Sequence, residues 1–250
     1  MNDVAIADEL LSIELRLCVE LKSLQYEENI SFIYDPVVYA FDVHSQFVHK
    51  FCSSGKRILF LGLNPGPWGM SQTGVPFGEV SLVRDWLGLS GEVGQPDRVH
   101  PSRPVLGFDC QRSEVSGRKF WSLFQRLCGS PHNFFRHCFI YNYCPLAFLS
   151  ASGKNITPVE FKAGKRKQVT DACDQALCAV LQLLGVRTVV ALGRFAEKRA
   201  SDAVRQGTLG HVQVACLPHP SPRNFAVKDW AQESLDQLSK LQLLPFFTPG

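Results

Sequence analysis

The chain has 250 residues, of which 45% are hydrophobic and 20% charged, and its formal net charge at pH 7 is +3. This balance is typical of a globular protein, so we treat residues 1–250 as a single domain, and the weak positive charge does not by itself indicate a nucleic-acid partner. We expect neither a secretory signal nor a membrane span, and the nine cysteines, which include no Cys-x-x-Cys pair, argue against a disulfide scaffold and a zinc cage.

Apolar patterns in the chain predict helices that alternate with strands. Leucine and isoleucine recur at spacings of three and four over residues 10–24, which predicts a first helix. Four short, almost continuously apolar runs are typical of strands covered on both faces. They lie at residues 57–64, 137–143, 186–192 and 211–217.

Helix signals follow in the second half of the chain. Thr157-Pro158-Val159-Glu160 has the pattern of a capping box with proline at the first helical position, and Gly185 is a plausible helix end. Gly164 is expected to interrupt the helix between them, and two more helices are predicted at residues 194–205 and 228–241. The alternation predicts an α/β three-layer sandwich with a central, mostly parallel four-stranded sheet flanked by helices.

Unusual polar sequences follow three of the predicted strands. They are Asn64-Pro65-Gly66-Pro67, Asn142 with Cys144-Pro145, and His219-Pro220-Ser221-Pro222-Arg223. Ligands of open α/β sheets bind at the carboxyl ends of the strands, so we expect these clusters to converge on one site. The irregular segment 88–117 is long enough to contribute to that site.

Each cluster also has a purely structural interpretation. The first loop could be a rigid turn, the Asn142 amide could pair with backbone, and a histidine at a strand end is often structural. A similar sequence, His100-Pro101-Ser102-Arg103, lies in the long polar segment and is interpreted as a surface feature without a catalytic role. Cys144 as a nucleophile is a further alternative, although no base is evident beside it.

The same blocks resemble the uracil-DNA glycosylase superfamily, and within it the single-strand-selective monofunctional enzymes. The resemblance runs in order from about Ile58 to Trp230. Its blocks are Gly62–Pro67, Gly69–Glu79, Arg103–Gly107, Ser113–Gly117, Asn142–Leu146 and His219–Asn224. After Asn224 the chain departs from the family pattern, which is more polar and one residue longer there, so the wedge into DNA is expected to work differently.

The resemblance implies a role for each matching residue. Asn64 and His219 would be catalytic: the first would position the attacking water, and the second would stabilise charge on uracil O2. Phe77 would stack on the flipped base and Asn142 would read its edge. Gly66 and Met70 would line the pocket near C5, where a 5-hydroxymethyl group is admitted. The segment of Pro220, Ser221, Pro222, Arg223 and Asn224 would enter the DNA helix.

These roles agree with the chemistry of the reaction. The bond breaks through a cationic sugar and a uracil anion, so a hydrogen-bond donor such as His219 helps, and an asparagine suffices to orient water. We therefore expect a monomeric, nuclear enzyme that acts on uracil and 5-oxidised uracils in single- and double-stranded DNA, without a metal or other cofactor. Two alternatives remain: a thymine or hypoxanthine mismatch glycosylase of the same fold, and a non-catalytic nucleic-acid-binding module.

Overall fold

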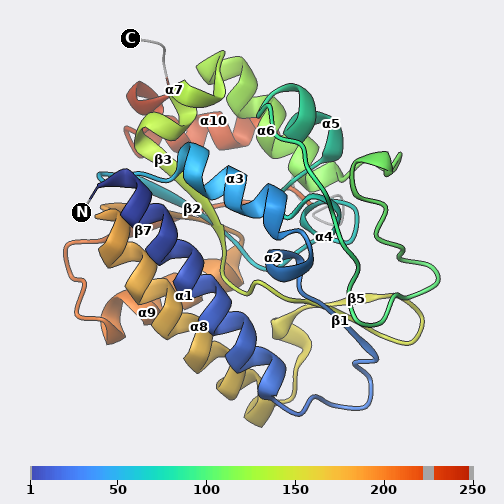
Figure 1. The fold of residues 1–250 in the computed structure, drawn as a ribbon. Coiled ribbons are helices and arrows are strands. Elements are labelled where there is room, and N and C mark those ends of the chain that lie inside the picture. The colour runs from blue at the N-terminus through green and yellow to red at the C-terminus, as the bar shows by residue number, and fades with distance from the viewer. Residues whose placement is uncertain (1, 222–227, 248–250) are drawn as a thin grey trace.

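The computed structural model describes residues 2–221 and 228–247, and its centre is a parallel sheet (Figure 1). The strands of this sheet are β2 (Ile58–Gly62), β3 (Cys138–Asn142), β6 (Thr188–Leu192) and β7 (Gln213–Leu217). They are ordered β3-β2-β6-β7, and every neighbouring pair is parallel. The predicted four-stranded sheet is thus confirmed, with each strand two or three residues shorter than its apolar run.

Helices cover both faces of the sheet, as the predicted three layers require (Figure 1). One layer contains α1, α8 and α9, and the other contains α6, α7 and α10, while α3 packs beside α1. Their bounds are α1 (Asp3–Ser23), α3 (Phe41–Phe51), α6 (Val115–Cys128), α7 (Pro131–His137), α8 (Ala163–Leu184), α9 (Arg194–Gln206) and α10 (Trp230–Lys240). Among the described residues, no helix is long and apolar enough to cross a membrane.

An aromatic cluster fixes the position of α6 on the sheet. Phe60 in β2 lies with its ring centroid 5.4 Å from that of Phe120 and 4.9 Å from that of Phe124, both in α6. All three side chains are fully buried, and burying one such ring contributes about 1.5–3 kcal/mol. The cluster therefore holds the N-terminus of α6 at the carboxyl edge of the strands.

Several short elements had no clear signal in the sequence. A second, antiparallel sheet has the order β1-β4-β5, and short helices surround the loop after β2. These elements are β1 (Phe32–Tyr34), α2 (Pro36–Tyr39), α4 (Met70–Thr73), α5 (Val80–Asp85), η1 (Gly107–Asp109), β4 (Ala147–Leu149), β5 (Asn155–Ile156) and η3 (Leu244–Phe246). A further short element, η2 (Pro158–Glu160), coincides with the predicted capping box. Strands of two or three residues are too short to show an alternating pattern.

The helix predictions were correct in place and partly wrong in extent. The capping box at Thr157 forms, but it begins the single 3₁₀ turn η2, and extended backbone at Phe161 separates this turn from α8. Gly164 lies in the first turn of α8 and does not interrupt a helix, contrary to expectation. Gly185 ends α8 in the left-handed conformation with φ +69°, as predicted.

Candidate active site

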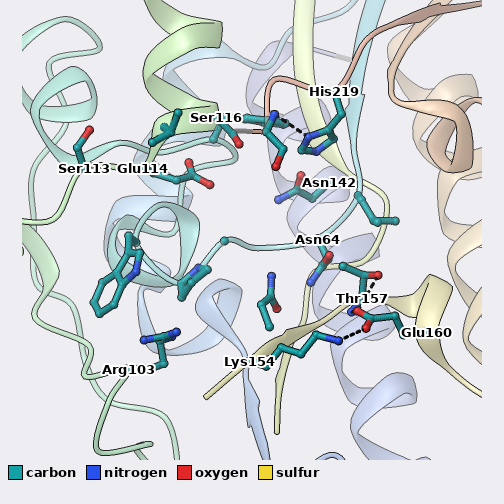
Figure 2. A pocket seen from close by; sticks show the side chains of 18 residues that line it. Asn64, Arg103, Ser113, Glu114, Ser116, Asn142, Lys154, Thr157, Glu160 and His219 are labelled. Atoms are coloured by element: carbon teal, nitrogen blue, oxygen red, sulfur yellow. Dashed lines mark hydrogen bonds and ion pairs between the residues drawn. The ribbon is translucent and has the colours of Figure 1, made fainter. Parts of the chain in front are cut away.

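A cavity of about 430 Å³ lies at the carboxyl edge of the parallel sheet (Figure 2). Its walls come from the loops after β2 and β7, the end of β3, and the irregular segment before α6. The lining residues are Leu63, Asn64, Gly66, Pro67, Trp68, Phe77, Arg103, Ser113, Glu114, Val115, Ser116, Asn142, Lys154, Asn155, Thr157, Glu160, His219 and Ser221. The expected convergence of the three polar clusters is therefore present.

Asn64, Asn142 and His219 line one side of this cavity, although they come from different parts of the sheet (Figure 2). Asn142 ends the edge strand β3, Asn64 follows the central strand β2, and His219 follows the opposite edge strand β7. Because all the strands are parallel, their carboxyl ends meet at one edge. This arrangement allows one small ligand to contact all three side chains.

The Asn64 amide retains a hydrogen-bond donor inside the cavity wall. Its Nδ2 is buried and has no hydrogen-bond partner among the described residues. A buried donor without a partner costs about 1–3 kcal/mol, so this group is well suited to a substrate or a water molecule.

The Asn142 amide occupies space left by a glycine. Gly62 is its register partner on β2, and a Cβ atom at Gly62 would overlap both Asn142 Oδ1 and the Phe77 ring. Asn142 Nδ2 donates to Met70 Sδ at 3.1 Å. An amide NH₂ carries two donors, so this contact leaves a second N–H, as well as Oδ1, for a ligand.

Two residues predicted near C5 of the base differ in their placement. Gly66 lines the cavity, as predicted. Met70 is fully buried and does not line the cavity, and its Sδ accepts a hydrogen bond from the Asn142 amide. The cause is the short helix α4, which begins at Met70 and turns this side chain toward the core.

Phe77 lies in the cavity wall with a strained backbone. Its φ is +55°, in the left-handed region that non-glycine residues rarely adopt, at a cost of about 1–3 kcal/mol. The ring stacks on Phe120 with centroids 5.3 Å apart, and it lies 6.5 Å from the His219 ring. This strained backbone places the Phe77 ring beside the polar groups of the cavity.

His219 is held in one tautomer by its own turn. The backbone N–H of Ser221 donates to His219 Nδ1 at 3.0 Å, so in the neutral ring the proton is on Nε2. Burial lowers the pKa of His219 below its ordinary value, which favours that neutral ring. His219 is therefore a neutral N–H donor at the cavity.

Glu114 is a cavity residue whose importance the sequence did not reveal. Its carboxyl packs so closely against Gly66, Gly69 and Gly117 that a Cβ atom at any of the three would overlap it. Burial raises the pKa of Glu114 to about 7, and Glu79 adds to the effect. The motif Ser113–Gly117 was a visible signal, but only the packing shows why glycines surround the acid.

The other acid in the cavity, Glu160, is engaged in local contacts. Its Oε1 accepts from the Thr157 backbone N–H at 3.0 Å, and its Oε2 pairs with Lys154. These contacts hold the pKa of Glu160 below its ordinary value. Glu160 is thus a charged rim residue with its acceptors occupied.

Cationic side chains also stand at the rim beside Trp68. The guanidinium carbons of Arg103 and Arg112 lie 5.4 and 4.4 Å from the centroids of the Trp68 ring system. Such cation–π contacts hold guanidinium groups in place, and Arg103, which itself lines the cavity, adds positive potential there.

The remaining candidates from the sequence differ in their placement. Cys144 is fully buried away from the cavity, which leaves it no access as a nucleophile. Pro220 is buried and Ser221 lines the cavity, whereas Pro222, Arg223 and Asn224 lie outside the described residues.

His100 was wrongly expected at the surface. It is 4% exposed, its Nδ1 accepts from the Ser102 backbone N–H at 3.0 Å, and its Nε2 lies 3.0 Å from the Ala151 carbonyl oxygen. It thus repeats the local turn of His219 but supports a loop and does not line the cavity.

Residues 2–221 and 228–247 contain no cluster of three or more histidine, cysteine, aspartate or glutamate side chains that could hold a metal ion.

Comparisons with known proteins show related sequences and a shared fold. A family model for the uracil DNA glycosylase superfamily matches residues 49–239. The chain is 53% identical over 245 residues to the single-strand selective monofunctional uracil DNA glycosylase of Bos taurus, covering 98% of this chain and 90% of that protein. The Mus musculus protein of that name is also 53% identical, with coverages of 98% and 88%. The crystal structure of wild-type Pedobacter heparinus SMUG2 matches with a TM-score of 0.67, covering 98% of this chain and 99% of that one, but at 20% identity it shows the fold alone.

Proposed function

The chain belongs to the uracil-DNA glycosylase superfamily, and from this premise we propose that it hydrolyses the bond between uracil and deoxyribose in DNA, as a monofunctional enzyme of base-excision repair. The observation that carries the proposal is the meeting of Asn64, Asn142 and His219 at one cavity. The product is an abasic site and free uracil.

Base recognition is assigned to Phe77 and Asn142. A uracil flipped out of the strand stacks on the Phe77 ring, while the Asn142 amide accepts from N3–H and donates to O4. Cytosine has no N3–H and carries an amino group in place of O4, so both contacts fail. A site whose buried polar groups would be left unpaired can reject such an analogue by about 10⁴-fold.

Bond cleavage is assigned to His219 and Asn64. The neutral His219 ring donates its Nε2–H to uracil O2 as negative charge develops on the departing base. A preorganised donor of this kind contributes about 2.7–4 kcal/mol to the transition state. Asn64 orients the water that attacks C1′, and because an amide is no base, we expect slower turnover than with a carboxylate in its place.

The substrate range follows from the wall near C5 and from the cost of base flipping. We propose that 5-oxidised uracils are accepted and that the thymine methyl is rejected, because the methyl displaces a bound water without replacing its hydrogen bonds. Flipping costs a few kcal/mol in a duplex and less in a single strand. Both kinds of DNA are therefore substrates, and the single strand is favoured.

A single-stranded oligonucleotide with one deoxyuridine tests the proposal, with EDTA present because no metal or other cofactor is expected. We expect free uracil and an alkali-labile abasic site, and Asn64→Ala should lose most of the activity while still binding DNA. Loss of activity on chelation would contradict the metal-free mechanism.

A panel of oligonucleotides tests the alternatives. Release of thymine or hypoxanthine in preference to uracil would indicate a mismatch glycosylase, and DNA binding without base release would indicate a non-catalytic module. We further propose that the protein is a monomer. We also propose that it acts in the nucleus, because its substrate is DNA.

A further inference from the structure

A second hollow, of about 330 Å³, lies between α6 and the start of α10, and we call it the cationic groove. It is lined by four cationic side chains, Arg118, Lys119, Arg126 and Lys228. Three of them come from α6, where Arg118 and Arg126 are eight residues apart and so lie on the same helix face. The structure describes no ion pair for any of the four.

The acid in the groove does not neutralise this charge. Asp229 caps α10: its Oδ1 accepts from the backbone N–H groups of Ala231 and Gln232 at 3.0 and 3.1 Å. A carboxylate at a helix N-terminus interacts with the positive end of that helix. Four cations therefore face one engaged anion, and like charges gathered in this way attract an external anion.

The groove and the active-site cavity are connected by the helix α6 and by one hydrogen bond. Glu114, Val115 and Ser116, at the beginning of α6, line the cavity, and the following turns of the same helix line the groove. At the groove floor, Trp230 is 3% exposed, and its Nε1 donates to the Pro218 carbonyl at 2.7 Å, directly before His219. The groove is thus fixed relative to the base-binding side chains.

We infer that the cationic groove binds backbone phosphates of the DNA strand that carries the extruded nucleotide. The inference rests on the proposed function, and it assigns a binding site to the sugar–phosphate backbone of the substrate. From Ser116 to Arg126 the helix extends over about 15 Å. This length is sufficient to contact several consecutive backbone phosphates beside the target base. Contacts to phosphate position a protein on DNA without reading its sequence, as a search for scattered damaged bases requires.

The salt dependence of DNA binding tests this inference. The probe is a fluorescent single-stranded DNA oligonucleotide without uracil, so that no turnover occurs, and its Kd is measured by anisotropy from about 50 to about 200 mM salt. We compare the wild type with Arg118→Gln, Arg126→Gln and the double variant. Arg187→Gln is the control, because Arg187 is exposed and has no described ion pair. It directly precedes β6 and so lies at the amino ends of the strands, away from the cavity at their carboxyl ends.

Each lost phosphate contact on a single strand should lower the slope of log affinity against log salt by about 0.7, and the double variant should lower it by about 1.4. At about 50 mM salt we expect the double variant to bind about tenfold more weakly than wild type, with Arg187→Gln unchanged. Slopes and Kd values equal to those of Arg187→Gln would overturn the inference. Thermal unfolding of each variant confirms that the compared proteins are folded.

Two further measurements separate the possible failures. Uracil release is measured with the same preparation of wild-type protein: absence of release contradicts the proposed function, whereas normal release together with unaffected groove variants contradicts the groove alone. An RNA oligonucleotide of the same sequence is titrated in parallel. A loss of affinity for RNA without a loss for DNA would assign the groove to a different ligand and overturn the inference.

Discussion

The backbone N–H of Ser221 donates to Nδ1 of His219, and this one contact decides which ring nitrogen carries the proton. The same contact recurs between Ser102 and His100, where it only shapes a loop. The turn is therefore a local property of the His-Pro-Ser sequence, and the position of the turn in the fold determines whether its histidine faces the cavity.

Replacement of His219 by glutamine should lower kcat by about 10²- to 10³-fold, because a donor to the developing uracil anion is misplaced. Because burial lowers the pKa of His219 below its ordinary value, the wild-type ring should be neutral at pH 7, and its protonation should begin to reduce activity at a lower pH than an exposed histidine would. Nitrogen NMR of labelled histidines, assigned by the loss of one signal in His219→Gln, should show the Nε2–H tautomer. A cationic His219 at neutral pH would contradict this account.

Glu114 should give the reaction a falling limb above about pH 7. Its pKa is raised to about 7, so the carboxyl is neutral at lower pH and becomes an anion as the pH rises. An anion in the cavity wall opposes departure of the uracil anion. Glu114→Gln should remove this limb from the profile of kcat/KM against pH.

Glu160→Gln is the matched control for that profile. Glu160 lines the same cavity, but its pKa is lowered, so it is already charged throughout the range and its replacement should leave the alkaline limb in place. An alkaline limb that persists unchanged in Glu114→Gln would show that another group is titrating.

Gly62→Ala should damage base recognition and stability together. A methyl group there overlaps Asn142 Oδ1 and the Phe77 ring, and overpacking of this kind costs about 1–3 kcal/mol. Gly164→Ala is the control, because no atom lies within 4 Å of the added Cβ and the residue lies in helix α8. That change should be neutral or stabilise by up to about 1 kcal/mol. Urea unfolding and uracil release would show both effects.

The buried pair of His44 and Glu14 should make stability depend on pH. His44 Nε2 lies 2.7 Å from Glu14 Oε2, and its Nδ1 lies 2.7 Å from the Gly74 carbonyl oxygen, so both nitrogens face acceptors. Although burial opposes the charged ring, these acceptors raise the pKa of His44 overall. The stabilisation is then fully present below the unfolded pKa of about 6.5 and is lost as the pH rises through the higher folded value.

His44→Gln should therefore cost more stability at pH 6 than at pH 9. The difference between the free energies of unfolding of wild type and variant, measured in urea at both pH values, checks this expectation. His49→Gln is a comparison at the surface: His49 Nε2 lies 2.9 Å from Asp8 Oδ1, so its contribution should be smaller, about 0–1 kcal/mol. An equal cost of His44→Gln at both pH values would show that the ring is not charged in the folded protein.

The four parallel strands and the meeting of Asn64, Asn142 and His219 could be predicted, because buried strands have a plain apolar pattern and parallel strands end together. Glu114 could not be placed in this way. Its surroundings are three glycines from two different segments, and only the packing of α6 on β2 brings them together. The helices α3, α6 and α7 were not predicted from the sequence. The seven residues of α7 are too few to show a helical period.

The position of β7 has a consequence for inactivation. Among residues 2–221 and 228–247, this strand is at the edge of the sheet and pairs with β6 alone, and it ends two residues before His219. An edge strand can open locally at a lower free energy than the whole domain requires. Mild heating should therefore abolish uracil release at a temperature at which circular dichroism still shows intact helices. Cooling should restore activity without a refolding lag.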